Sequence, residues 1–277
     1  GGNQDDVMVG GIGDDYLKGE AGQDRLDGGD GYNTLAGGTE DDTYVFRDAA
    51  VNQIDTVVEL SGEGKDTLDF ASLTTALVAN LTSDTTLATM NHRIVWTGGS
   101  GQAANFENVH GGAANDQITG NATDNLLRGN GGNDTLTGGV GNDILVGGDG
   151  NDTLKGISGR NILIGGTGAD LLLGGTGEDI LLSGSLSYAD NNVGLQALLS
   201  EWVQATSYQS RLEHLQGITP GGANGGYVLN PTSVSDDAGA DYLTGGTGQD
   251  WYLASSTQDV ITDKAVDEIF THIDGWI

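Results

Sequence analysis

The chain has 277 residues, of which 36% are hydrophobic and 49 are glycine, so a thick conventional hydrophobic core is excluded. The 40 acidic residues against 10 basic ones give a formal net charge of -30, which repels nucleic acid and anionic membrane surfaces and attracts cations. Cysteine is absent, which excludes disulfides and thiolate metal sites and leaves hard oxygen ligands, the chemistry that suits calcium.

A nine-residue period runs through much of the chain. Each unit has glycine or a stand-in at positions one, two and four, Asp or Asn at position six, and an apolar residue at position eight. The clearest stretch, residues 129–155, reads GNGGNDTLT, GGVGNDILV and GGDGNDTLK. This pattern predicts a three-residue strand around position eight and a tight turn in the six glycine-rich residues before it. Two units would then close one coil of a flattened parallel solenoid, with the eighth-position side chains in a thin core.

In chain order, the pattern predicts six segments. Residues 1–46 form a first repeat array, and residues 47–110 form an irregular β-rich segment that continues the solenoid, with a separate small β domain as the alternative. Residues 111–186 form a second array. Residues 187–235 form a helical insertion, residues 236–253 a short repeat pair, and residues 254–277 a tail that is a candidate export signal.

The helical insertion is predicted from a change of period after Ser183. Val193, Leu195, Leu198 and Trp202 are spaced for one face of a helix, which Asp190 or Asn191 would cap. A second short helix with Tyr208, Leu212 and Leu215 would end near Gly217. We expect the pair to cover an open end of the solenoid, with docking to a partner or a membrane as the alternative.

Position six carries a side-chain oxygen in all fifteen units. Its residues are Asp6, Asp15, Asp24, Asn33, Asp42, Asp116, Asn125, Asp134, Asp143, Asp152, Asn161, Asp170, Asp179, Asp241 and Asp250. These units resemble the repeats-in-toxin, or RTX, nonapeptide GGxGxDxUx of bacterial secreted proteins. The resemblance implies an all-β fold, a parallel β-roll or β-solenoid, with calcium ions between same-side units. Position-six carboxylates and backbone carbonyls of the glycine loops would be the ligands.

The resemblance also implies which units share a side, because same-side neighbours are two units apart. Asp116, Asp134, Asp152 and Asp170 would stack on one side of the second array, and Asn125, Asp143, Asn161 and Asp179 on the other. Asparagine lowers the ligand charge, so we expect weaker binding on the second side. Without ions, the closely stacked aspartates repel and the glycine-rich backbone is costly to order, so we expect a disordered metal-free chain.

No catalytic motif accompanies the repeats, and the chain is predicted not to be an enzyme. The four histidines are scattered without an HExxH pattern, and neither GxSxG nor a P-loop occurs. No apolar run is long enough to span a membrane. Three functions stay open. The first is a secreted or cell-surface structural or adhesive module that contacts matrix proteins or assembles with itself. The second is the non-catalytic C-terminal export and folding module of a secreted protease or lipase, and the third is a polysaccharide-binding roll.

Overall fold

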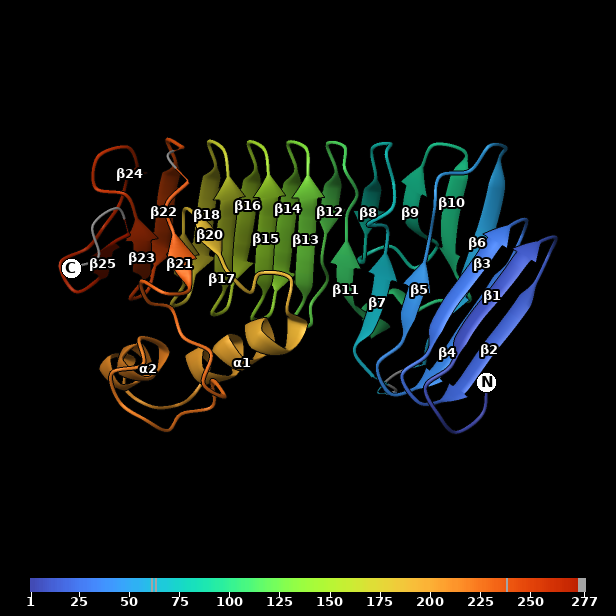
Figure 1. The fold of residues 1–277 in the computed structure, drawn as a ribbon, viewed down its shortest axis with the longest axis horizontal. Helices are drawn as coiled ribbons and strands as arrows, with labels where there is room; N and C mark the ends of the chain where they lie inside the picture. Colours follow the sequence, from blue (N-terminus) through green and yellow to red (C-terminus); the bar gives the residue numbers. More distant parts are fainter. Residues whose placement is uncertain (61, 63, 238, 274–277) are drawn as a thin grey trace. The chain divides into compact units, whose positions relative to one another are not determined.

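The computed structural model describes residues 1–60, 62, 64–237 and 239–273. The last four residues of the predicted tail, 274–277, lie outside this part, as do residues 61, 63 and 238 of the predicted segments. The chain divides into two compact units, residues 1–136 and 137–277, and the boundary falls within strand β14 (Thr135–Val140). Each unit is built from two sheets whose strands mostly alternate along the chain (Figure 1). The exception lies in the first unit, where β8 (Val78–Asn80), β9 (Thr86–Met90) and β10 (Arg93–Thr97) follow one another in one sheet and β9 pairs antiparallel with the other two.

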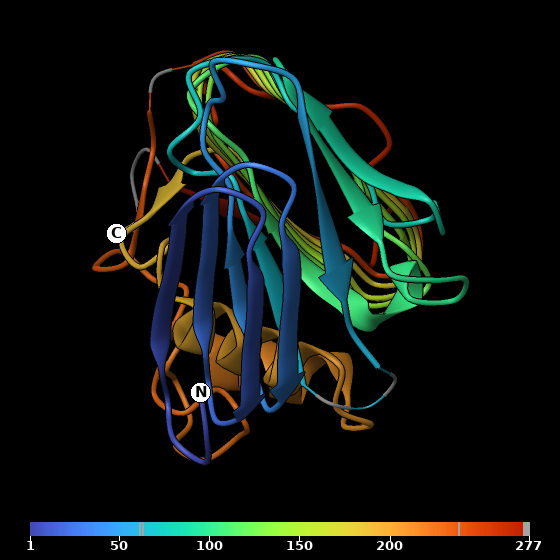
Figure 2. The same ribbon diagram turned by 90° about the vertical axis from the view of Figure 1, so that its right-hand side faces the viewer.

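In the first unit, successive repeats form a strand of one sheet and then a strand of the other. One sheet has the order β1 (Val7–Ile12), β3 (Arg25–Asp30), β5 (Thr43–Val45), β7 (Asp66–Asp69), β11 (Phe106–His110) and β13 (Leu126–Gly131). The other has the order β2 (Tyr16–Ala21), β4 (Thr34–Thr39), β6 (Gln53–Val58), β10 (Arg93–Thr97), β9 (Thr86–Met90), β8 (Val78–Asn80) and β12 (Gln117–Thr119). Figure 2 has the first of these strands in front, with turns joining them at both ends. The 3-10 helix Ala103–Asn105 precedes β11.

In the second unit the same alternation continues. One sheet contains β15 (Ile144–Asp149), β17 (Ile162–Thr167), β19 (Ile180–Leu182), β23 (Trp251–Ala254) and β25 (Ile269–His272). The other contains β16 (Thr153–Ser158), β18 (Leu171–Thr176), β22 (Tyr242–Thr247) and β24 (Val260–Ile261). A separate two-stranded ribbon pairs β20 (Ser185–Leu186) with β21 (Val234–Ser235).

The register of the strands follows the predicted two-unit coil. Leu145 pairs with Leu163 and Leu154 with Leu172, so position eight stacks on position eight in parallel. From Leu26 onward the eighth-position side chains are fully buried, which places the core between the two sheets. The fold is therefore the predicted parallel β-roll. Most repeat strands have six residues rather than the predicted three, because pairing continues through the first residues of the next unit, as in Gly148 opposite Gly166.

The predicted helical insertion is present between β20 and β21. Helix α1 (Asn192–Trp202) begins after Asn191, whose side chain accepts a hydrogen bond from the Gly194 amide, and helix α2 (Tyr208–Leu215) follows. The expected position over an open end of the solenoid is wrong. Strands β22 and β23 pair directly with β18 and β19, so the insertion leaves the stack unbroken (Figure 1).

The helices instead contact turns of the second unit. Trp202 Nε1 donates to the Glu178 carbonyl at 2.6 Å, and Arg211 pairs with the Glu178 carboxylate. Tyr208 donates to the Asp250 carbonyl at 2.8 Å. The apolar face of the two helices is thus buried beside these turns, and the chain that follows them rejoins the stack at β22. No helix among the described residues is long and apolar enough to cross a membrane.

Candidate calcium sites between the coils

The position-six side chains form ladders that link successive coils. In each step, one carboxylate or amide oxygen accepts a hydrogen bond from the backbone N–H of the position-six residue one coil earlier. Asp6 N donates to Asp24 Oδ1 at 2.7 Å, and Asp24 N donates to Asp42 Oδ1 at 2.7 Å. Because the step recurs along both ladders, each side chain that takes part in it is held in one orientation at its turn.

The ladders contain the predicted same-side neighbours. Besides the steps above, hydrogen bonds of this kind join Asp15 to Asn33, Asp116 to Asp134, Asp143 to Asn161, Asp152 to Asp170, and Asn161 to Asp179. Asp170 N and Asp179 N donate to Asp241 Oδ1 and Asp250 Oδ1, so the short repeat pair continues the ladders across the insertion. Asn125 Oδ1 accepts a hydrogen bond from Asn121 N in its own turn. Thirteen of the fifteen side chains are buried, and Asp6 and Asp15 are half-buried.

Four ladder members were missed by the nonapeptide frame. One is Glu107, whose Oε2 accepts from Asp66 N at 2.9 Å, and the other three are aspartates. Asp55 Oδ1 accepts from Asn33 N, Asp66 Oδ1 from Asp42 N, and Asp259 Oδ1 from Asp241 N. The signal that would have found these aspartates is the triplet of Asp, any residue and an apolar residue, as in DTV, DTL and DVI. This triplet survives where the glycines that define the repeat are absent. The strands of the irregular segment therefore bring carboxylates to the same turns as the repeats do.

The second oxygen of several aspartates has no hydrogen-bond partner among the described residues although it is buried. These atoms include Oδ2 of Asp24, Asp170, Asp179, Asp241 and Asp250. A buried, unpartnered carboxylate oxygen is costly, so its repeated presence requires a cation or a proton. Calcium takes several carboxylate and carbonyl oxygens at about 2.3–2.6 Å, and the donor set present here consists of such oxygens.

The position-one glycines leave space beside these oxygens. A Cβ added at Gly165 would lie 2.4 Å from Asp170 Oδ2 and 2.5 Å from the Ser183 carbonyl oxygen. A Cβ added at Gly174 would lie 2.5 Å from Asp179 Oδ2 and 2.6 Å from the Gly245 carbonyl oxygen. An oxygen-lined space therefore lies where two coils meet, and only glycine keeps it open. The residues present fit calcium, and the position-six carboxylates with these carbonyls would hold it.

Electrostatics support a cation in these turns. Burial, together with the nearby carboxylates of Asp152, Asp237 and Asp259, raises the pKa of Asp170 to about 7, against a hydrogen bond from Asp152 N that lowers it. Burial likewise raises the pKa of Asp179 and Asp250 to about 7, and that of Asp66 and Asp241 to about 8. In the absence of a metal ion, the folded roll disfavours ionisation of the carboxylates that calcium requires. A bound divalent cation would reverse this preference.

The asparagine positions differ from the aspartate positions in what their second atom does. Asn33 Nδ2 donates to Asp55 Oδ1 at 2.8 Å, and Asn125 Nδ2 donates to the Glu107 carbonyl at 3.1 Å. Each amide thus presents a donor where an aspartate presents an acceptor. This geometry supports the expectation that sites containing asparagine bind calcium more weakly.

At the Asn33 step a guanidinium takes the place expected for a cation. Arg93 on β10 is 3% exposed, and its Nη1 pairs with Asp55 Oδ2 while its Nη2 donates to the Gly29 carbonyl at 2.9 Å. The contacted atoms are a ladder carboxylate oxygen and a glycine-loop carbonyl oxygen, the two ligand types of the repeat sites. Arg93 therefore supplies this step with a tethered positive charge, which the sequence alone did not indicate.

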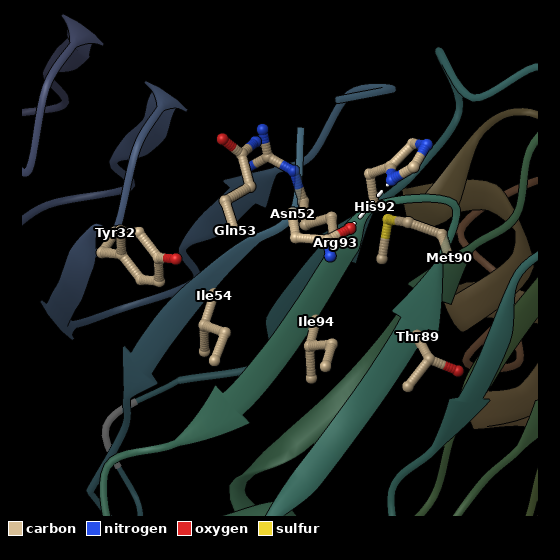
Figure 3. Close-up of a pocket in the computed structure, with 9 residues that line it drawn as sticks. All are labelled: Tyr32, Asn52, Gln53, Ile54, Thr89, Met90, His92, Arg93 and Ile94. Atoms are coloured by element: carbon tan, nitrogen blue, oxygen red, sulfur yellow. Dashed lines mark hydrogen bonds between the residues drawn. The ribbon is translucent and has the colours of Figure 1, made fainter. Parts of the chain in front are cut away.

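A cavity of about 400 Å³ lies beside this step in the first unit (Figure 3). Tyr32, Ile54, Ile94 and Met90 contribute to its lining, and His92 Nδ1 lies 2.8 Å from Asn52 Oδ1 at its rim. Its lining contains no carboxylate, so it is not a candidate cation site.

Comparison with known proteins agrees with this geometry. A search of curated proteins found no match. The family model described as the RTX calcium-binding nonapeptide repeat matches residues 1–35, 105–136, 119–154, 155–185 and 233–261, which together make up just over half of the chain. Repeats of this family bind Ca²⁺, and the buried acidic groups described above are compatible with such sites. The chain therefore belongs to the RTX calcium-binding nonapeptide-repeat family.

Proposed function

We propose that this chain is a calcium-folded structural module of a secreted or cell-surface protein, in which ions between the coils hold the roll together. The observation that carries this proposal is that the two oxygens of position-six carboxylates such as Asp170 and Asp179 have different surroundings. In Asp170, one oxygen accepts a backbone hydrogen bond from the preceding coil, and the other lies buried beside a glycine-loop space without a partner. Asp179 repeats the arrangement on the other side.

Charge and chain entropy explain why the ions would be required for folding. The formal net charge is -30, and the ladders bring carboxylates of successive coils together in buried turns. Glycine loses more conformational freedom on folding than other residues, and the chain has 49 of them. About nine ions, one for each same-side pair within the two arrays, would add about +18 charges and offset over half of the repulsion. We infer that the metal-free chain is disordered at neutral pH.

The finer part of the proposal is a structural or adhesive role with self-association. Its support is a group of exposed apolar side chains on β1 and β2. Val7, Val9, Ile12 and Tyr16 are 77%, 66%, 93% and 67% exposed. Val7 and Val9 are two residues apart on β1 and therefore face the same side of that strand, and exposed apolar groups that gather on one face mark interaction surfaces. We assign no reaction to the module, because its buried aspartates are already engaged in the ladders.

A calcium titration of the metal-free chain tests the proposal. Far-ultraviolet circular dichroism would follow folding, light scattering would follow mass, and magnesium would serve as the control cation. We expect a cooperative transition from coil to β structure that calcium produces and magnesium does not, because magnesium demands a smaller octahedral ligand set. Growth in mass during the same titration supports self-association. A chain that is already folded at neutral pH in chelator contradicts calcium-dependent folding.

A further inference from the structure

Two of the fifteen repeats carry a tyrosine at position eight, where the others carry Leu, Ile or Met. These are Tyr44 and Tyr252, and both are fully buried. Each lies in the last unit before its array stops, residues 37–45 and 245–253. A buried phenol needs a partner for its hydroxyl, so the exchange of leucine for tyrosine at both positions calls for a polar neighbour.

At the end of the short repeat pair, the Tyr252 hydroxyl enters the glycine-loop space. A Cβ added at Gly245 would lie 2.1 Å from Asp250 Oδ2 and 2.4 Å from the Tyr252 hydroxyl. The same hydroxyl lies 3.2 Å from Asp263 Oδ1 and 3.4 Å from Glu268 Oε2. Asp250 is 0% exposed, and its Oδ2 has no hydrogen-bond partner among the described residues. The Tyr252 hydroxyl thus connects the Asp263 and Glu268 carboxylates to the space beside Asp250 Oδ2.

The first array ends in the same arrangement. A Cβ added at Gly37 would lie 2.1 Å from Asp42 Oδ2 and 2.6 Å from the Tyr44 hydroxyl, which donates to Glu59 Oε1. Asp42, Glu59 and Asp66 are all buried and each offers an oxygen within 4.8 Å of the others. Asp42 lies just before β5, whereas Glu59 directly follows β6 and Asp66 begins β7, so the three carboxylates come from two successive coils.

The register explains why both sites differ from the sites inside the arrays. Ala36 pairs with Val58, so Glu59 follows in the coil after Gly37, at the place of a position-one glycine. Leu243 pairs with Ile261, and Gly245 N donates to Asp263 Oδ1 at 3.0 Å, so Asp263 takes the corresponding place after Gly245. Inside the arrays a backbone carbonyl of the next coil faces the space, as Gly245 does for Gly174. At the array ends an acidic side chain faces it instead.

We propose that each array ends in an additional calcium site, completed by an acidic side chain of the following non-repeat coil and a tyrosine hydroxyl. Asp250, Tyr252, Asp263 and Glu268 form one site, and Asp42, Tyr44, Glu59 and Asp66 form the other. This inference rests on the proposed calcium-dependent folding and extends it to residues outside the nonapeptide. More carboxylates in the ligand set raise calcium affinity, so these sites fill before those inside the arrays. A calcium ion in either site would link the non-repeat coil to the last repeat of the array.

Terbium, which replaces calcium at oxygen sites and emits when a nearby tyrosine absorbs light, is the probe for this proposal. Calcium and terbium titrations would compare the wild type with Glu59→Gln and Asp263→Asn. Glu40→Gln and Asp267→Asn are the controls, because both side chains are exposed and their removal changes the net charge equally. We expect each test variant to lose one tight site, with affinity there reduced at least about tenfold, since even outer partners of a metal ligand contribute that much. The controls should match the wild type.

Tyr44→Phe keeps the ring in the core and removes only the hydroxyl, so it tests the site at the end of the first array even if Glu59→Gln fails to fold. We expect it to weaken terbium binding and calcium binding at the first site and to reduce sensitised emission. Wild-type stoichiometry and affinity in Tyr44→Phe and Asp263→Asn, in a chain that still folds with calcium, would overturn this inference and leave the proposed function intact. A wild-type chain that binds no calcium would overturn both.

Discussion

Replacing Gly165 by alanine should remove one calcium site while leaving the others intact. The new methyl group would lie 2.4 Å from Asp170 Oδ2 and 2.5 Å from the Ser183 carbonyl oxygen, closer than side-chain carbons approach other atoms in proteins. Gly131→Ala is the matched control, because the nearest atom to its methyl group outside the neighbouring residues would be the Ala113 Cα, at 3.8 Å. Both glycines lie at or near the end of a repeat strand, and neither has a positive φ.

The expected magnitude has two parts. Forcing a methyl group into a filled space costs about 1–3 kcal/mol in the folded state, whether or not calcium is present. Loss of one ion costs a further amount that depends on calcium, about 2.7 kcal/mol when free calcium is 100 times the dissociation constant. Gly165→Ala should therefore lower the free energy of unfolding by roughly 4–6 kcal/mol in abundant calcium. Gly131→Ala should change it by less than about 1 kcal/mol.

Calorimetric titration and circular dichroism would measure this difference. Gly165→Ala should bind fewer calcium ions than Gly131→Ala and should need more calcium to reach half-folding. Identical stoichiometry and identical titration midpoints for the two variants would refute the assignment of the glycine-loop space as the ion position. A loss of stability in Gly165→Ala that does not vary with calcium would point to simple crowding instead.

Three further predictions follow from named features. The metal-free chain should gain β structure as the pH falls from 8 to 5, which circular dichroism would measure. The reason is that buried aspartates such as Asp170 have a folded-state pKa of about 7, above the unfolded value. The stability that they contribute is present below the unfolded pKa and is lost as the pH rises through 7, by roughly 2–3 kcal/mol for each group. Arg93→Gln should destabilise the protein at low calcium by about 3–5 kcal/mol, because it leaves the buried Asp55 carboxylate without its cationic partner. Excess calcium should restore part of this loss in a thermal melt. An absence of restoration would contradict the idea that the guanidinium stands in for an ion. Ile157→Gly should raise the melting temperature, because it removes the backbone strain of a β-branched residue at φ 83°, a gain of about 1 kcal/mol in folding free energy. Val140→Gly, at an exposed position without positive φ, is the control and should lower the melting temperature.

The nine-residue period by itself determined the β-roll, the stacking of position eight in the core and the pairing of position six across coils. It could do so because a regular repeat gives every unit the same neighbours, so one unit's environment predicts that of the rest. The helical insertion and its Asn191 cap were also predictable, because the spacing of apolar residues and capping chemistry are local properties.

The long-range connections were decided only by the tertiary structure. Asp170 N donates to Asp241, which is 71 residues later in the sequence, and Asn33 N donates to Asp55, which is 22 residues later. Neither separation is the 18 residues of two repeat units, so the nine-residue period does not predict either contact. Arg93 reaches Asp55 because β10 pairs with β6, and Glu59 reaches Tyr44 because β6 pairs with β4. Such contacts depend on which strand the chain returns to after an irregular excursion. That choice is made by packing between segments distant in sequence, which a local pattern does not encode.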